Sequence, residues 1–342
     1  MVFAHFGTRH VYQMASEAAD QIRFRRRTAR QDGARVGEPC RSGPGRHARA
    51  LRMPGISQTR GLGKQAASHV GVYLEYYGLK EQPFSITPNP RFLFFSAKHR
   101  EAFNHLLYGI RERKGFVQLT GEVGAGKTTL CRAMLEQLGK NFSTALILNP
   151  VLTVDQLVKA IAMEFGLRVK HMDRLEIVAE INNFLLAQVE NGRDTVLIID
   201  EAQDLSTELL EQVRLLSNLE TDDRKLLQIV LMGQPELRDR LNDYNLRQLR
   251  QRITVRYHLR PLKRGELGQY LQHRLTVSGS KGAPYFSAAA LWRIFHYSKG
   301  VPRLINAVCD KCLLAGFVQQ KEQITFRLVG AAIRELEGDI NV

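Results

Sequence analysis

The chain has 342 residues, 44% of them hydrophobic, which is enough for two or three domains with apolar cores. No run of 18 apolar residues occurs, so the sequence encodes no membrane-spanning helix. Four cysteines in so long a chain argue against a disulfide framework, and we expect a reducing, cytoplasmic setting. Residues 1–71 hold 13 Lys/Arg against 4 Asp/Glu and so carry +9 of the net charge of +15. The basic pI is therefore weak evidence for a nucleic-acid-binding face on the remainder.

Residues 1–71 are rich in Arg, Gly, Ser and Ala without sustained periodicity, and we expect a basic, disordered leader. Three interpretations stay open. The leader is an arm that contacts nucleic acid or acidic lipid, or a mitochondrial-type transit peptide, against which its Gly and Pro content argues. In the third interpretation, which we favour, the leader is not part of the native protein but is translated from DNA upstream of a true start at Val72. N-terminal sequencing of the natively expressed protein tests this hypothesis.

An aromatic segment begins at Tyr73 and is interrupted by prolines at positions 83, 88 and 90, which forbid a long helix. We expect an irregular lead-in that packs against the α/β domain that follows. Ser96 is the predicted N-cap of a helix over about 98–113.

Residues 121–128 read GEVGAGKT and match the phosphate-loop pattern G-x-x-x-x-G-K-[ST] at every fixed position. A predicted strand over 116–119 precedes them and a predicted helix over 129–138 follows, which is the context that the motif needs. We expect Lys127 to contact the β and γ phosphates of ATP and the Thr128 hydroxyl to bind Mg²⁺. The other predicted nucleotide-binding residues of this segment are Gly121, Glu122, Val123, Gly124, Ala125, Gly126 and Thr129. The alternative, a glycine-rich turn with an incidental lysine, does not account for the flanking strand and helix.

Apolar strands and amphipathic helices alternate across the centre of the chain. The predicted strands cover 116–119, 145–148, 195–199, 227–232 and 254–258. The predicted helices between them cover 129–138, 154–165, 175–190, 208–218 and 237–241. Nearly continuous apolar strands are typical of a sheet covered on both faces, so we expect an α/β domain with a mostly parallel five-stranded sheet over 72–260.

An apolar strand over 195–199 ends in Asp200 and Glu201. Asp200 is placed to hold Mg²⁺ through water, and Glu201, one residue on, to polarise water towards the γ-phosphate. The alternative is a strand that ends in acidic surface residues.

Two further polar groups follow later strands. Gln234, just past the strand over 227–232, is placed to sense the γ-phosphate and orient water; the alternative is a loop glutamine without a contact. Arg247, Arg250 and Arg252 precede the last strand, where a cation delivered to a neighbouring subunit would act as an arginine finger. Arg252 is our first choice and Arg250 the second, against the alternative of a solvated basic helix edge.

Beyond residue 261 the pattern predicts only helices, over 264–276, 288–297, 302–318 and 326–336, and hence a small all-helical domain over 261–342. Pro302 is a helix-start signal, and Arg303 beside it is placed to reach the nucleotide and couple its state to the angle between domains. Cys309 and Cys312 lie on the apolar face of a predicted helix, so we interpret them, like Cys131, as core residues and not a metal pair.

In combination, these motifs resemble the AAA+ ATPases, in which a nucleotide-binding domain precedes a helical lid. The resemblance narrows to the general secretion pathway protein A (ExeA-type) family and covers roughly residues 73–338. The matching stretches are 76–84 (YYGLKEQPF), 87–90 (TPNP), 121–129 (GEVGAGKTT), 200–203 (DEAQ), 210–220 (LEQVRLLSNLE) and 233–237 (GQPEL).

That resemblance implies a Mg²⁺-dependent, oligomeric ATPase that assembles or positions a secretion or pilus-type machinery at the cell envelope, with an inner-membrane partner protein. Longer members carry a membrane span and a peptidoglycan-binding part after the lid. Here we expect a partner to supply that contact and the chain itself to be cytoplasmic. The core and lid also resemble DNA-binding transposition or partition helper ATPases, which is the alternative function. Genomic neighbourhood distinguishes the two.

Overall fold

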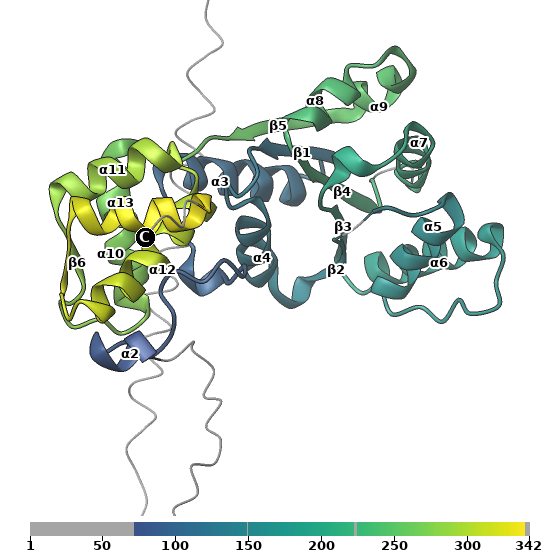
Figure 1. Cartoon of the computed structure of the whole chain (residues 1–342). Coiled ribbons are helices and arrows are strands. Elements are labelled where there is room, and N and C mark those ends of the chain that lie inside the picture. Colours follow the sequence, from purple (N-terminus) through teal and green to yellow (C-terminus); the bar gives the residue numbers. More distant parts are fainter. Residues whose placement is uncertain (1–71, 149, 222–223, 339–342) are drawn as a thin grey trace, which may run out of the picture. The chain divides into compact units, whose positions relative to one another are not determined.

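The computed structural model describes residues 72–148, 150–221 and 224–338, which all belong to one unit of the chain spanning Ser68–Val342 (Figure 1). The basic leader, Cys40 and the upstream-translation hypothesis therefore concern residues outside the described part. Within that part, no helix is both long and apolar enough to cross a membrane.

A five-stranded sheet forms the centre of the α/β part, and every strand pair in it is parallel. Its strands are β1 (Phe116–Gly121), β2 (Phe142–Ile147), β3 (Asp194–Ile199), β4 (Leu227–Gly233) and β5 (Ile253–Leu259). They lie in the order β2-β3-β4-β1-β5, so β1 and β3 flank β4. The carboxyl ends of all five strands meet at one edge of the sheet, and the predicted fold class is confirmed.

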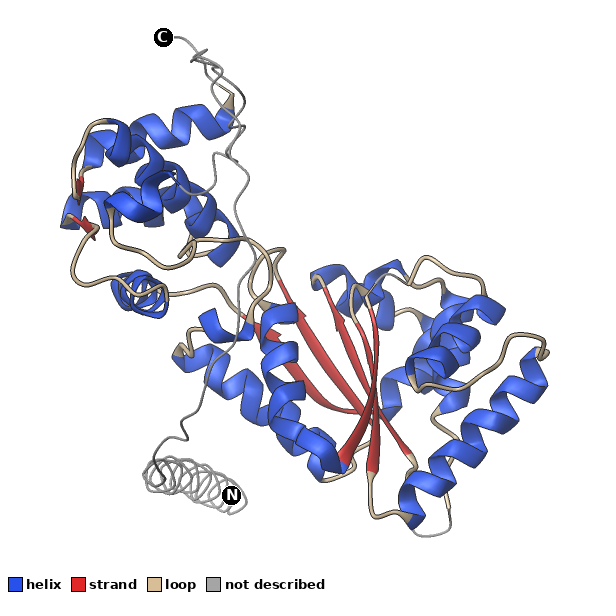
Figure 2. Ribbon diagram, turned by 90° about the horizontal axis from the view of Figure 1, so that it is seen from below, coloured by secondary structure: helices blue, strands red, loops and turns tan. Residues whose placement is uncertain are grey.

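Helices cover both faces of this sheet (Figure 2). Alternate strand residues divide between two cores: Val196 and Ile198 of β3 pack with one set of helices, Leu197 and Ile199 with the other. One face carries α3 (Ala97–Arg111) and α4 (Lys127–Leu138). The other carries α5 (Val154–Glu164), α6 (Arg174–Glu190), α7 (Thr207–Leu216), α8 (Pro235–Leu241) and α9 (Arg247–Arg252). Burial on both faces explains the continuous apolar strands.

The helix boundaries lie close to those expected from capping residues. Ser96 is the N-cap of α3, and its hydroxyl accepts a hydrogen bond from the His99 N–H at 3.2 Å, as predicted. Helix α4 begins at Lys127, two residues earlier than predicted. The lysine and the threonine of the phosphate loop therefore belong to its first turn. Four short 3₁₀ segments complete this part: η1 (Pro90–Phe92), η2 (Gly139–Asn141), η3 (Ala202–Asp204) and η4 (Tyr244–Leu246).

The C-terminal part consists of α10 (Arg264–Val277), α11 (Ala288–Ser298), α12 (Pro302–Val318) and α13 (Phe326–Glu337). A parallel pair, β6 (Tyr285–Phe286) and β7 (Gln323–Ile324), adds two strands where the sequence predicted only helices. Two-residue strands are too short to show an alternating pattern, which is why sequence periodicity does not reveal them.

The lead-in segment packs only in part as predicted. Its short helix α2 (Val72–Tyr76), Tyr77 and Phe84 lie in one core with α10–α13, whereas Leu93 packs with α3, α4 and the sheet. Arg274 of α10 is buried and donates to the carbonyl oxygens of Pro83 and Ser85, which fixes the lead-in on the helical part. Prolines that prevent a helix leave main-chain carbonyls without partners, and the buried guanidinium supplies the donors. The core of the helical part is therefore built from two segments of the chain. One precedes the strands of the sheet in the sequence, and the other follows them.

The cysteines in the described part are buried and free. Cys309 and Cys312 are completely buried on α12, and burial raises the pKa of the Cys312 thiol to about 12. Burial likewise raises the pKa of Cys131. These thiols stay protonated at neutral pH, which confirms their interpretation as core residues.

Candidate active site

The phosphate loop joins β1 to α4 through two residues in the left-handed region, Gly124 (φ 76°) and Gly126 (φ 97°). A side chain at Gly124 would also lie 2.4 Å from Cβ of Arg303. Only glycine meets both conditions. The loop delivers the chain to the N-terminus of α4, where the first backbone N–H groups have no partner within the helix. These groups and the helix dipole favour an anion such as phosphate.

Lys127, the first residue of α4, is only 6% exposed. Its ammonium donates to the carbonyl oxygens of Gly121 at 2.8 Å and Glu122 at 3.2 Å, so the side chain lies back along the loop. Burial lowers the pKa of Lys127, and the nearby carboxylates of Glu201 and Asp200 oppose that shift. A desolvated ammonium with a third N–H is a strong partner for a phosphate oxygen.

Thr128 and Asp200 bring a hydroxyl and a carboxylate together at the adjoining strand end. The Thr128 hydroxyl donates to Asp200 Oδ2 at 2.6 Å, and the Glu201 N–H donates to Asp200 Oδ1 at 3.0 Å. Asp200 is 3% exposed, and burial raises its pKa while these two hydrogen bonds oppose the shift. Such a buried carboxylate beside a hydroxyl fits Mg²⁺, which is commonly held by few protein oxygens together with phosphate and water. No group of three acidic, His or Cys side chains in the described residues would form a metal site by itself.

Glu201 has a left-handed backbone (φ 51°), which is uncommon for a residue with a side chain and costs of order 1 kcal/mol. Its Oε2 accepts from the side-chain amides of Gln203 at 2.8 Å and Gln234 at 3.3 Å. Gln234 is the N-cap residue of α8 but makes no side-chain capping bond, so its side chain is available to Glu201. Gln234 therefore contacts the proposed base, while its role as a sensor of the γ-phosphate stays a prediction.

Arg303, the second residue of α12, contacts the phosphate loop through its backbone. Its N–H donates to the Gly124 carbonyl at 3.2 Å, while the side chain is exposed. The structure therefore places the main chain of Arg303 against the loop, while the predicted contact of its side chain with the nucleotide stays a prediction.

The arginines of α9 do not form one cluster. Arg252 is the last residue of α9 and donates through Nη1 to the Ser217 hydroxyl at 2.7 Å, next to the end of α7. Ser217 is 2% exposed. Arg250 is half-buried, and Arg247 lies over the exposed ring of Tyr244 at 5.5 Å. The guanidinium that we ranked first as a finger is thus held within its own chain.

Two residues of this site were missed by sequence reasoning. Gln203 bonds Glu201, as above, and accepts from the Gln234 N–H through Oε1 at 3.0 Å. His99 is buried and lies with Nε2 3.1 Å from the Ala125 carbonyl and Nδ1 2.8 Å from the Ser96 hydroxyl. Since a carbonyl only accepts, Nε2 carries the proton and Nδ1 accepts from Ser96. Neither residue belongs to a spaced pattern, so the sequence offers no signal for them beyond the DEAQ stretch.

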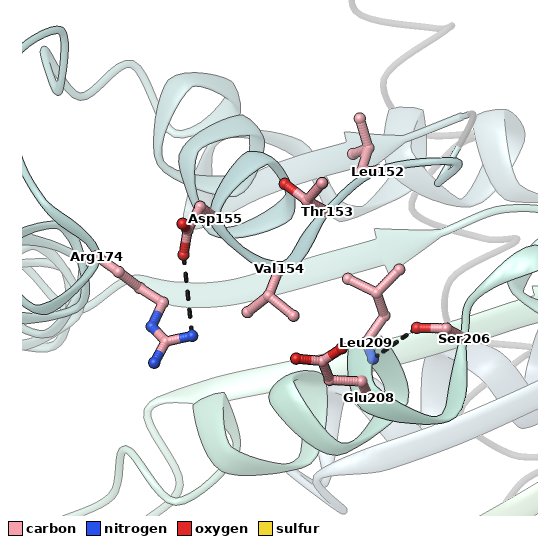
Figure 3. Close-up of a pocket in the computed structure, with 8 residues that line it drawn as sticks. All are labelled: Leu152, Thr153, Val154, Asp155, Arg174, Ser206, Glu208 and Leu209. Atoms are coloured by element: carbon pink, nitrogen blue, oxygen red, sulfur yellow. Dashed lines mark hydrogen bonds and ion pairs between the residues drawn. The ribbon is translucent and has the colours of Figure 1, made fainter.

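A hollow of about 330 Å³ lies away from the phosphate loop, between the starts of α5 and α7 (Figure 3). Arg174 and Asp155 face each other across one side of it at 3.8 Å. A second hollow of about 230 Å³, also bordered by Arg174, is more apolar and includes Leu175 and Leu215. Neither borders Lys127, Asp200 or Glu201, so they are separate from the chemistry described above.

Comparisons with known proteins find a family and a relative. An AAA domain family model matches residues 110–241. General secretion pathway protein A of Aeromonas hydrophila is 46% identical over 268 residues, which cover 78% of this chain and 49% of that protein. This chain therefore spans about half the length of that relative.

Solved structures show the same fold at low sequence identity. The ORC2 protein of Aeropyrum pernix in its ADP form has a TM-score of 0.58 at 17% identity, covering 74% of this chain and 72% of that one. Drosophila ORC bound to DNA has a TM-score of 0.57 at 17% identity, covering 83% of this chain and 70% of that one. With the sheet order, the phosphate loop and the sequence identity taken together, this chain belongs to the AAA+ family of the general secretion pathway protein A type.

Proposed function

We propose that the protein binds Mg·ATP at the phosphate loop and hydrolyses it. Lys127 contacts the β and γ phosphates, Thr128 and Asp200 hold the metal, and the N–H groups of the loop surround the phosphates. When bound, Mg²⁺ would neutralise part of the negative charge of the triphosphate. The observation that carries the proposal is the 2.6 Å contact between Thr128 and Asp200 beside the buried ammonium of Lys127.

Glu201 is the proposed general base, because it follows Asp200 directly and its Oε1 has neither of the amide contacts that hold Oε2. It would accept a proton from the attacking water as the new bond from the water oxygen to the γ-phosphorus forms and the bond from that phosphorus to the bridging oxygen breaks, so that ADP leaves. Gln234 and Arg303 are the proposed sensors of the nucleotide. The contact of Arg303 with the loop gives a physical route by which the nucleotide changes the angle between domains.

We further propose that the protein acts as a homo-oligomer in which Arg252 reaches the nucleotide of a neighbouring subunit. Its bond to Ser217 must then break on assembly, because a single guanidinium cannot fill both positions. Arg250 of the same helix remains the second candidate.

The name of the Aeromonas relative supports a role in general secretion. The proposed role is ATP-driven assembly or positioning of a secretion or pilus-type envelope machinery, by a cytoplasmic protein that reaches the inner membrane through a partner. A DNA-binding helper ATPase is the second candidate. The distribution of charge does not favour it, since most of the excess lies in residues 1–71.

Steady-state turnover with Glu201→Gln tests the catalytic assignment. Loss of the base should lower kcat by about 10²- to 10⁴-fold while Mg·ATP binding, measured by calorimetry, is retained. Glu190→Gln, an exposed residue at the end of α6, is the matched control and should behave as wild type. Parental turnover in Glu201→Gln would show that another group is the base.

A further inference from the structure

We propose that Gln203 is a positioning residue that fixes the Glu201 carboxylate against the end of β4, so that Glu201 and Gln234 act as one unit. The proposal rests on the proposed function, and it concerns which group holds the base in place.

The side chain of Gln203 joins two strand ends. Its Nε2 donates to Glu201 Oε2 at 2.8 Å, beyond β3, and its Oε1 accepts from the Gln234 N–H at 3.0 Å, beyond β4. Because β3 and β4 are neighbours in the sheet, one amide spans the gap between them. A change in the position of Gln234 is therefore transmitted to the Glu201 carboxylate through two hydrogen bonds.

The surroundings select an amide at this position. A hydrogen-bond donor is needed for the carboxylate and an acceptor for the backbone N–H, and an amide side chain carries both on one carbon. The main-chain carbonyl of Gln203 accepts a hydrogen bond from the Arg240 guanidinium of α8 at 2.6 Å. This bond fixes the main chain that carries the amide side chain. A side chain at Gly233 would lie 2.7 Å from Gln203 Oε1, so the glycine leaves room for the bridge.

The bridge acts on one oxygen of the base. Both amides, from Gln203 and Gln234, donate to Oε2 of Glu201, which orients the carboxylate and leaves Oε1 for a proton. A residue that only stabilised the 3₁₀ turn over 202–204 would need no bond to the carboxylate.

Two substitutions distinguish positioning of the Glu201 carboxylate from a merely structural role of Gln203. Gln203→Ala removes the bridge, and kcat should fall by about tenfold or more with KM and Mg·ATP affinity within about twofold. Gln203→Glu keeps the length and the acceptor but places a second carboxylate against Glu201. Two adjacent carboxylates share a proton, so the acid limb of the kcat profile should move upwards by about one pH unit. Gln272→Glu, exposed on α10, is the matched control and should move neither quantity.

A charge swap gives a readout that does not depend on turnover. Gln203→Glu should lower the urea midpoint of unfolding through carboxylate repulsion. Adding Glu201→Gln should recover the midpoint, because the new amide can donate to the new carboxylate while the acceptor for the Gln234 N–H is kept. Recovery means that the double variant is more stable than the sum of the single changes predicts.

Additive effects in the swap would overturn the inference, even if the wild-type protein proves to have no turnover and the proposed function fails. With an active wild type, an unchanged kcat in Gln203→Ala together with an unmoved acid limb in Gln203→Glu would overturn it while leaving the ATPase proposal intact.

Discussion

The two halves of the proposed site differ in what their side chains bind before any ligand arrives. At the ends of β1 and β3, Thr128 and Asp200 bond each other and Lys127 lies along the loop beside them. Beyond β4 and at the end of α9, the groups hold partners within the chain. Gln234 bonds Glu201, and Arg252 bonds Ser217. The first half is preorganised for Mg·ATP, whereas in the second half Arg252 must exchange partners to act.

Lys127→Ala tests the preorganised half and should have the largest effect. Removing a buried ammonium from the centre of the phosphate site should weaken Mg·ATP binding by at least about 100-fold, since charge-assisted contacts in desolvated sites are strong. Titration calorimetry measures the change. Lys140→Ala, an exposed lysine in η2, is the control and should bind as wild type. Full affinity in Lys127→Ala would mean that the loop does not hold the triphosphate.

Arg252→Ala tests the half that must exchange partners, and its expected effect is smaller because binding within one chain is retained. The part of the ATPase activity per subunit that increases with protein concentration reports subunit assembly. It should fall by about tenfold or more, since an arginine finger stabilises charge on the transferring phosphoryl group. The matched control is Ser217→Ala, which removes the same intrachain bond and keeps the cation.

With Ser217→Ala, turnover should stay at the parental level or rise, because the guanidinium is released. If both variants lose turnover equally, Arg252 supports the fold between α7 and α9 and Arg250 becomes the candidate finger. If neither variant loses turnover, Arg252 does not act on the nucleotide of a neighbouring subunit.

The difference between the halves also explains which parts were predictable from sequence. Lys127 and Thr128 lie in one contiguous motif, and Asp200 directly follows an apolar strand, so local patterns locate them. Hydrophobic periodicity leaves the strand order open, yet parallel strands bring their carboxyl ends to one edge in any order, which is why the residues meet. The strands of the sheet and the helices around it were predictable for the same reason, because hydrophobic periodicity and capping residues are local patterns.

Side-chain bridges between distant segments were not predictable. Gln203 and Gln234 are 31 positions apart and His99 and Ala125 are 26 apart, and no periodicity links either pair. The first part of the lead-in lies in a different core from the predicted one, because its aromatic residues show burial without showing the partner. Only the fold identifies Arg274 as the group that binds it.

Substitution of His99 should have the smallest effect of the changes discussed, since, within the described part of the chain, His99 contacts the phosphate loop only through the Ala125 carbonyl. Burial lowers its pKa, opposed by its bond to Ala125 and by the carboxylate of Glu266 on α10. A histidine with a folded pKa below its unfolded value of about 6.5 is protonated first in the unfolded state. Its contribution to stability is therefore complete above that pH and is lost as the pH falls towards the folded pKa.

Urea unfolding at pH 7.5, 6.5 and 5.5 measures that loss, which for one group cannot exceed about 1.4 kcal/mol per pH unit. Burial also lowers the pKa of His258 and His273, so the wild-type slope contains three contributions of the same sign. His99→Gln removes one of them while an amide still supplies a donor for Ala125, and the slope should become shallower. His171→Gln, which changes an exposed histidine, should leave the slope as it is. An unchanged slope in His99→Gln would mean that protonating this imidazole does not destabilise the fold, and that the bond from His99 to Ala125 does not support the phosphate loop.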